Sequence, residues 1–342
     1  MKILASSYDK KEKGIYLIDF DKKTLKFKLD RWLVTKDLPS YLNRKDNYLF
    51  ASLKNSGSSE SQGGLASYEL KAEDIRLISH VSSYGCSYTH VFVNHDNSYI
   101  LGANYHGGTT DLYKLNFPLV TKILDSFVNT GIGPDINLRQ TSAHPHMVGQ
   151  TPDGKYYYTV DLGADKIVVY TVKNEKLVED QGRTVNLTPG SGPRHLAFDH
   201  SGRFAYVVCE ISNKIDCYRY ADGHFEFFQR IKAKPDHFKG ENSASAIKIT
   251  DSNNHLLVSN RGHNSLSFYR IDQENGELTL LYMVHTGATP RDFCIVDDKY
   301  VFAACQDANE IELFFLNETN ETLVRSTSLF KINQPVCVIK GE

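Results

Sequence analysis

Histidine, arginine and carboxylate side chains recur at the boundaries of short apolar runs in this sequence. Residues that open such a run include His90, His146, Arg194, His195 and Arg291, and residues that close the following run include Asn104, Asp161, Glu210, Arg261 and Gln306. A histidine titrates near neutral pH and can take a proton from water, whereas an arginine can bind an anion through two parallel hydrogen bonds. A carboxylate in the same site can act as a base or orient an imidazole. These residue types predict a site that binds and converts a small anionic molecule.

The boundary residues belong to a repeated unit. Residues 145–161 and 193–210 each contain an apolar strand, a polar turn with Gly, and a second apolar strand that ends in a carboxylate. The same unit recurs, in places more loosely, at residues 39–55, 88–104, 244–261 and 290–306. Each unit continues into two further strand-like segments, and four strands at a spacing of about 45–55 residues are typical of a β-propeller blade.

The two ends of the chain complement each other. Residues 334–340 form a first strand without a second, whereas residues 2–7 and 14–19 form later strands without a first. Joined, they complete a seventh blade and remove the open edge. The sequence therefore predicts an all-β fold, a seven-bladed β-propeller with four antiparallel strands per blade, its ring closed by N- and C-terminal strands in one blade. We expect residues 1–342 to form a single domain, because two separate packed-sheet domains would give the ends no reason to complement each other.

Antiparallel pairing predicts where the boundary residues lie. The start of the first strand and the end of the second strand share one end of a blade, so these residues should lie on one rim of the central channel. Two enlarged connections, residues 128–141 and 233–243, should cover the same face. The Ser/Gly-rich residues 56–64 are typical of a solvated connection and lack the G-x-x-x-x-G-K-[ST] pattern of a phosphate loop.

Composition argues against several classes of partner. Lys and Arg number 39 against 41 Asp and Glu, a net charge of −2, so we expect no nucleic-acid partner. No apolar run approaches the ~18 residues of a membrane span and the N-terminus lacks a signal-peptide pattern, so we expect no membrane partner and a cytoplasmic location. We also expect no cofactor and no metal, because arginines near Asp161 and Glu210 would repel a cation. The sequence does not specify an oligomeric state.

The cysteines are spread along the chain without a C-x-x-C pair. They are Cys86, Cys209, Cys217, Cys294, Cys305 and Cys337. In a chain of this length without a secretion signal, this pattern predicts reduced cysteines that act as small core residues.

Short motifs along the repeat resemble those of a known family. They are H-P-H-M at 144–147, D-L-G-A-D at 161–165, G-P-R-H at 192–195, V-C-E at 208–210, S-N-R-G at 259–262 and P-R-D-F at 290–293. In this order and at blade spacing they resemble the lactonase family of seven-bladed propellers. That family includes bacterial 6-phosphogluconolactonases and the fungal 3-carboxy-cis,cis-muconate lactonizing enzyme.

The resemblance implies an active site of one His, one Glu and two Arg, which fall on His146, Glu210, Arg194 and Arg261. It implies metal-independent hydrolysis of 6-phosphogluconolactone to 6-phosphogluconate in the pentose phosphate pathway, with a small anionic sugar lactone as the partner. The remaining boundary residues are expected to bind the substrate: Arg291, Asp161, His90, Asn104, His195 and Gln306.

Several alternatives stay open at this stage. Either His146 or Glu210 could be the general base, and the two arginines could bind phosphate, face the oxyanion or form a salt bridge between blades. Asp161 could position His146 or cap the turn that follows it. The reaction could instead be a muconate-type lactone-forming cycloisomerisation or hydrolysis of another sugar lactone. A non-catalytic propeller that binds a protein partner is the alternative outside enzymes.

Overall fold

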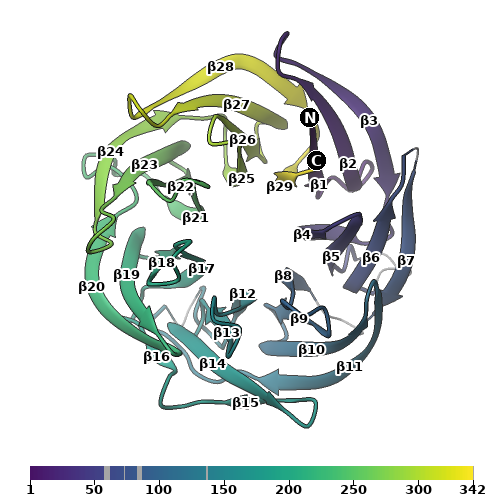
Figure 1. The fold of residues 1–342 in the computed structure, drawn as a ribbon, viewed down its shortest axis with the longest axis vertical. Helices are drawn as coiled ribbons and strands as arrows, with labels where there is room; N and C mark the ends of the chain where they lie inside the picture. Colours follow the sequence, from purple (N-terminus) through teal and green to yellow (C-terminus); the bar gives the residue numbers. More distant parts are fainter. Residues whose placement is uncertain (58–61, 73, 83–86, 136–137, 342) are drawn as a thin grey trace. The chain divides into compact units, whose positions relative to one another are not determined.

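Short runs of aromatic and β-branched residues form the strands of this protein. In β18 (Phe204–Cys209) and β26 (Tyr300–Cys305) every side chain is buried, whereas in β28 (Thr322–Lys331) exposed side chains alternate mostly with half-buried ones. A continuous apolar run suits a strand covered on both faces, and alternation suits a strand with one solvated face. The computed structural model describes residues 1–57, 62–72, 74–82, 87–135 and 138–341, in which 29 strands and no helix form (Figure 1).

The strands form seven sheets, named here in chain order. The first sheet contains, in pairing order, β29 (Pro335–Lys340), β1 (Lys2–Ser7), β2 (Gly14–Asp21) and β3 (Lys26–Val34). The second contains β4 (Leu38–Lys45), β5 (Tyr48–Lys54), β6 (Gly64–Leu70) and β7 (Ile75–Val81). The third contains β8 (Tyr88–Val93), β9 (Tyr99–Asn104), β10 (Thr109–Asn116) and β11 (Leu119–Val128). The fourth contains β12 (Pro145–Gln150), β13 (Tyr157–Asp161), β14 (Lys166–Lys173) and β15 (Lys176–Glu179), with β16 (Val185–Asn186) also paired to β14.

The last three sheets follow the same order of pairing. The fifth contains β17 (Pro193–Phe198), β18, β19 (Lys214–Ala221) and β20 (His224–Lys232). The sixth contains β21 (Ser243–Ile249), β22 (His255–Arg261), β23 (Ser265–Ile271) and β24 (Leu278–His285). The seventh contains β25 (Pro290–Val296), β26, β27 (Glu310–Asn317) and β28. The predicted fold class, all-β with seven blades of four antiparallel strands, is confirmed. The short strand β16 is an addition that the sequence analysis did not predict.

The first sheet joins the two ends of the chain. β29 pairs with β1, and the backbone N–H of Gly341 donates to the carbonyl oxygen of Lys2 at 2.9 Å. The labels of both termini lie beside these two strands in Figure 1. The prediction that N- and C-terminal strands complete one blade is therefore confirmed.

Apolar side chains from neighbouring sheets pack against each other and form the core. Phe268 of the sixth sheet and Phe314 of the seventh belong to one buried cluster, as do Leu101 of the third sheet and Tyr170 of the fourth. Each fully buried side chain of this size contributes about 1.5–3 kcal/mol of hydrophobic stabilisation. The sheets are thus held by their faces as well as by their hydrogen bonds.

A β-bulge interrupts the first strand of several sheets close to its start. The strand register shifts between Pro39 and Tyr41 in β4, Tyr88 and His90 in β8, Pro145 and Met147 in β12, Ala244 and Ile247 in β21, and Pro290 and Asp292 in β25. A bulge leaves one residue outside the ladder and changes the direction of its side chain. Two of the residues in these bulges, His146 and Arg291, are predicted site residues.

The described residues divide into two compact units. The first comprises Met1–Ala5, Leu17–Asp30 and Arg194–Glu342, and the second comprises Ser6–Tyr16 and Arg31–Pro193. Each unit is described by itself below, and a single domain over residues 1–342 stays a prediction. In the part of the chain that the structure describes, no helix is long and apolar enough to cross a membrane.

The described cysteines are free thiols in the core. They are Cys209, Cys217, Cys294, Cys305 and Cys337. Burial raises the pKa of the Cys294 thiol to about 12, which keeps it protonated. The prediction of reduced core cysteines is confirmed for these five, whereas Cys86, residues 58–61 of the Ser/Gly-rich segment and residues 136–137 of the first enlarged connection lie outside the described residues.

Removal of β29 tests how far stability depends on the shared first sheet. Val336, Cys337 and Val338 are buried, so a chain that ends at residue 334 loses three core side chains together with the pairing partner of β1. We expect the free energy of unfolding to fall by more than about 4 kcal/mol, measured by urea denaturation. A chain that lacks only residues 341–342 keeps all of β29 and is the matched control. Equal stability of the two truncated chains would contradict the role given to this sheet.

Candidate active site

Two arginines and one glutamate form a buried ionic cluster in the first compact unit. Glu210 Oε2 lies 3.0 Å from Arg194 Nε and 2.7 Å from Arg261 Nη2. Glu210 and Arg194 are almost fully buried, and the Arg261 side chain keeps 16% of its surface exposed. Two guanidinium groups against one carboxylate leave one positive charge in excess. The cluster therefore favours an additional anion.

Strand pairing explains why these three side chains meet. Arg194 is the second residue of β17, Glu210 directly follows β18, and Arg261 is the last residue of β22. β17 and β18 are neighbours in one antiparallel sheet, so the start of the first lies beside the end of the second. The turn between them contains Gly202 at φ 69°, a conformation that favours glycine. The structure thus brings together three of the four residues predicted to be catalytic.

Ser245 and His195 hold the Arg194 guanidinium in place. Arg194 Nη1 donates to the carbonyl oxygen of Ser245 at 2.9 Å and lies 3.2 Å from His195 Nε2. Ser245 lies in the bulge of β21, and its hydroxyl donates to the carbonyl oxygen of Arg291 at 2.7 Å. The sequence analysis missed Ser245 because it considered charged and aromatic residues. Ser245 occupies the same place in the repeat as His146, and a comparison of that column would have found it.

Burial makes the charge of Arg194 unfavourable. Its pKa is lowered to about 9, because burial and then the neighbouring Arg261 guanidinium disfavour the charged form, while Glu210 supports it. The Arg291 charge lowers this pKa further, whereas the charge of the neighbouring Asp292 opposes it. An anion bound at this cluster would offset the unfavourable charge, which gives a physical reason for affinity.

The ion pairs also bear on the role of Glu210. Two guanidinium groups contact the same Glu210 carboxylate, so this carboxylate can hold both of them in a fixed orientation. This arrangement favours Glu210 as the group that orients Arg194 and Arg261. The assignment of the general base to His146 or to Glu210 stays a prediction.

His146 lies on β12 in the second compact unit. It is the residue left out of the ladder by the bulge of that strand, and it is 5% exposed. Its carbonyl oxygen accepts a hydrogen bond from Thr89 Oγ1 at 3.0 Å, and its ring meets the Tyr105 ring edge to face at 5.8 Å between centroids. Tyr105 also stacks on His144 at 4.5 Å. The sequence analysis missed Tyr105, which directly follows Asn104 at the end of β9.

Asp161 is a buried carboxylate that binds backbone N–H groups. Its Oδ1 accepts hydrogen bonds from His144 N at 2.7 Å and from Ala164 N at 2.9 Å. Burial raises the pKa of Asp161, while these hydrogen bonds and the His144 charge oppose that effect. These contacts correspond to the turn-capping alternative, and they fix the backbone two residues before His146. A role of Asp161 in substrate binding stays a prediction.

His90 and Asn104 also lie in the second unit. His90 is buried, and its ring packs against Tyr41 with 4.1 Å between centroids. The Asn104 side chain accepts from Gly107 N at 3.2 Å and donates to Thr109 Oγ1 at 3.1 Å, so it stabilises the turn after β9. Their assignment to substrate binding stays a prediction.

His195, Arg291 and Gln306 lie in the first unit. His195 contacts Arg194, and Arg291 is linked to the same arginine through the Ser245 backbone and hydroxyl. Gln306 directly follows β26, where its backbone N–H donates to a carbonyl oxygen at 2.9 Å. The structure therefore brings His195 and Arg291 to the ionic cluster, and the role of Gln306 stays a prediction.

A side-chain amide anchors each enlarged connection, a buried one in the first and a half-buried one in the second. In residues 128–141, the Gln140 side chain is fully buried and donates to a backbone carbonyl oxygen at 2.9 Å. In residues 233–243, Asn242 Nδ2 donates to Asn213 Oδ1 at 2.6 Å. The function of these connections as covers of a site stays a prediction.

The ionic cluster is unsuited to a cation. Its charges are mainly those of guanidinium groups, which repel metal ions. Among the residues that the structure describes, no group of three or more His, Cys, Asp or Glu side chains is arranged to hold a metal ion.

Comparisons with known proteins agree on one family. The family model described as "Lactonase, 7-bladed beta-propeller" matches residues 2–340. A 6-phosphogluconolactonase from Bacillus subtilis is 30% identical over 334 residues, which cover 95% of this chain and 93% of that protein.

Solved structures resemble the chain over almost its whole length. A periplasmic gluconolactonase from Pseudomonas aeruginosa has a TM-score of 0.92 at 26% identity and covers 99% of this chain and 98% of its own. A protein from Lactobacillus plantarum has a TM-score of 0.91 at 28% identity, with 99% of each chain covered.

Substitution of Glu210 tests whether the cluster is electrostatically coupled. Glu210→Ala leaves two buried guanidinium groups without their shared carboxylate, so we expect the free energy of unfolding to fall by about 3–5 kcal/mol. Arg261→Ala removes the more exposed partner and should lower the free energy of unfolding by a smaller amount. Urea denaturation measures both, with Glu226→Ala, an exposed glutamate of β20, as the matched control. A Glu210→Ala protein as stable as that control would show that the ion pairs contribute nothing.

Proposed function

Because this chain belongs to the lactonase family of seven-bladed β-propellers, we propose that it hydrolyses 6-phosphogluconolactone to 6-phosphogluconate. The 30% identity with the 6-phosphogluconolactonase of Bacillus subtilis supports this substrate. The reaction would place the protein in the cytoplasm, in the pentose phosphate pathway, with the sugar lactone as its partner.

The observation that carries the proposal is the excess positive charge of the two arginines that contact Glu210. Arg194 and Arg261 both contact this carboxylate, and the planar guanidinium group can bind phosphate or carboxylate through two parallel hydrogen bonds. The protein as a whole has a net charge of −2, so a local positive site suits a small anion better than an extended acidic surface.

The proposed roles follow from the chemistry of lactone opening. A water oxygen adds to the carbonyl carbon, the bond from that carbon to the ring oxygen breaks, and the ring oxygen takes a proton. We assign to His146 the acceptance of the water proton and its return to the ring oxygen. Arg194 and Arg261 would stabilise the developing oxyanion or hold the phosphate, and Glu210 would orient them.

A second candidate is hydrolysis of unphosphorylated gluconolactone. It is favoured by the similarity to the Pseudomonas aeruginosa structure, a protein described as a periplasmic gluconolactonase. The two candidates differ in whether the excess positive charge at Glu210 serves the substrate phosphate or only the oxyanion. A comparison of the two substrates therefore separates them.

The phosphorylated lactone should be the better substrate. Charge-assisted hydrogen bonds to phosphate should make kcat/KM about 10- to 100-fold higher for 6-phosphogluconolactone than for gluconolactone. The assay uses purified, chelator-treated protein and subtracts the spontaneous hydrolysis of each lactone at each pH. A preference for gluconolactone would select the second candidate. Rates no greater than background for both lactones would overturn the assignment as a sugar lactonase and would favour a muconate-type substrate or a binding role.

Substitutions in the ionic cluster should separate binding from catalysis. Arg194→Lys and Arg261→Lys keep the charge but lose the planar fork, so kcat/KM should fall by about 10-fold or more. His146→Asn should lower kcat by about 10²-fold or more, because it removes the proposed base. Glu210→Gln should mainly raise KM, because it loosens both arginines and removes no proton acceptor.

Steady-state kinetics with the phosphorylated lactone measure these effects. Arg203→Lys is the matched control, because Arg203 is exposed and lies outside the predicted site. A Glu210→Gln protein that loses kcat by 10²-fold at unchanged KM would instead identify Glu210 as the base.

A further inference from the structure

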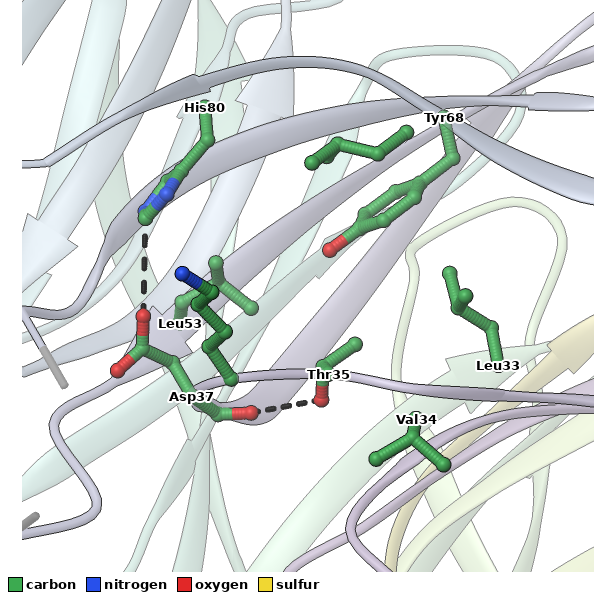
Figure 2. Close-up of a pocket in the computed structure, with 9 residues that line it drawn as sticks. Leu33, Val34, Thr35, Asp37, Leu53, Tyr68 and His80 are labelled. Carbon is green, nitrogen blue, oxygen red and sulfur yellow. Dashed lines mark hydrogen bonds and ion pairs between the residues drawn. The ribbon is translucent and has the colours of Figure 1, made fainter. Parts of the chain in front are cut away.

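A separate cavity lies in the second compact unit, where the chain leaves β3 and enters the second sheet. Its volume is about 260 Å³. The lining residues are Leu33, Val34, Thr35, Lys36, Asp37, Leu53, Tyr68, Leu77 and His80 (Figure 2). None of the ten predicted site residues lines it, so the cavity requires its own explanation.

The walls of the cavity are mainly apolar. Leu53 on β5 is buried, while Val34 at the end of β3 and Leu77 on β7 are 58% and 53% exposed. Large aliphatic side chains with half of their surface in water lose that exposure when a nonpolar molecule covers them. This arrangement favours a ligand with an apolar body.

The wall also holds a buried polar group, the Tyr68 hydroxyl. Tyr68 is 3% exposed, and Figure 2 shows its oxygen directed into the space between His80, Asp37 and Leu33. Within the described part of the chain, this hydroxyl makes no hydrogen bond. Buried tyrosine hydroxyls normally have a partner, so an unused one directed into a cavity indicates a ligand atom. Burial raises the pKa of Tyr68 and keeps the hydroxyl protonated, so it is a hydrogen-bond donor.

The polar side chains of Thr35, Asp37 and His80 already have partners, and His80 Nε2 lies 2.9 Å from the carbonyl oxygen of Gly63. Asp37 is 1% exposed, its Oδ1 accepts from Gln62 N at 3.1 Å, and its Oδ2 lies 3.9 Å from His80 Nε2. The Thr35 hydroxyl donates to the Asp37 carbonyl oxygen at 2.7 Å, as Figure 2 shows. The lining also contains two formal charges, the positive charge of Lys36 and the negative charge of Asp37. With one formal charge of each sign, the lining favours neither an anionic nor a cationic ligand.

We propose that this cavity binds a small neutral phenol or aromatic alcohol, whose ring lies against Leu53, Val34 and Leu77 and whose oxygen accepts a hydrogen bond from Tyr68. A closed apolar cavity of about 150 Å³ is enough to hold benzene, so the volume here accommodates a ring with one or two substituents. It is smaller than the pockets of about 300–1,000 Å³ that take drug-sized ligands. This site is independent of the proposed lactonase activity.

A pair of matched ligands tests the role of the Tyr68 hydroxyl. Calorimetric titration of the full-length protein with p-cresol should give saturable binding, about 3- to 10-fold tighter than the binding of toluene, because one neutral hydrogen bond is added. In Tyr68→Phe the two ligands should bind equally well. A p-cresol preference that persists in Tyr68→Phe, or no saturable binding to the wild-type protein, would overturn the proposal.

A pair of matched tryptophan variants tests the location of the site. Val34→Trp should fill the mouth of the cavity and abolish the rise in melting temperature that p-cresol causes in the wild-type protein. Val128→Trp, at a position of the same unit that is 65% exposed and outside the lining, should leave that rise unchanged. Without ligand, Tyr68→Phe should unfold at no lower urea concentration than the wild type, because it removes a buried hydroxyl that has no partner. Unchanged stabilisation by p-cresol in Val34→Trp would place the ligand elsewhere and overturn the proposal.

Discussion

In several sheets, the position of the first strand depends on hydrogen bonds to the one residue that the β-bulge leaves out of the ladder. The backbone carbonyl oxygen of that residue no longer pairs with the second strand, so a side chain from a neighbouring sheet donates a hydrogen bond to it. Thr89 donates to the carbonyl oxygen of His146, and Ser245 donates to that of Arg291. Arg194 in turn donates to the carbonyl oxygen of Ser245. A buried carbonyl without a partner costs about 1–3 kcal/mol, so these bonds fix the backbone from which the candidate active-site side chains project.

The ionic cluster of Arg194, Arg261 and Glu210 acts in the opposite direction, because burial of its charges lowers the free energy of unfolding. Desolvation of two arginines and a glutamate is expensive, and an apolar set of the same volume would be at least as stable. Burial and the Arg261 charge lower the pKa of Arg194, and the Glu210 charge opposes this effect only in part. An anion bound beside the two arginines would offset part of this unfavourable charge. The cluster lies beside a strand start that hydrogen bonds hold in place, which supports the proposal that it binds a ligand.

The sequence was sufficient for the fold and for part of the site. The repeated unit of apolar runs and turn residues, together with the complementary chain ends, predicted the seven sheets, and antiparallel pairing predicted that Arg194 lies beside Glu210. The bulges could not be predicted, because they depend on how two strands align and not on the composition of either one. Ser245 was missed because a serine carries neither the charge nor the ring that marked the other site residues, although it occupies the same place in the repeat as His146. The contacts of Asp161 with N–H groups depend on a turn geometry that composition does not encode. The cavity beside Tyr68 was equally invisible, since segments distant in the sequence create it.

The ionic cluster around Glu210 and the cavity beside Tyr68 each contain a buried polar group, but the two groups have opposite surroundings. At the ionic cluster, Glu210 is surrounded by charges, so affinity for an anion arises from the field and should weaken as salt screens it. In the cavity, Tyr68 is surrounded by aliphatic side chains, so affinity arises from the removal of nonpolar surface from water, and the hydroxyl only selects among ligands of similar shape. Ionic strength should therefore change the binding of a sugar phosphate at the cluster far more than the binding of a neutral phenol in the cavity. This difference follows from the chemistry of each lining, because a single hydrogen bond adds selectivity to a hydrophobic site whereas a net charge determines the class of ligand.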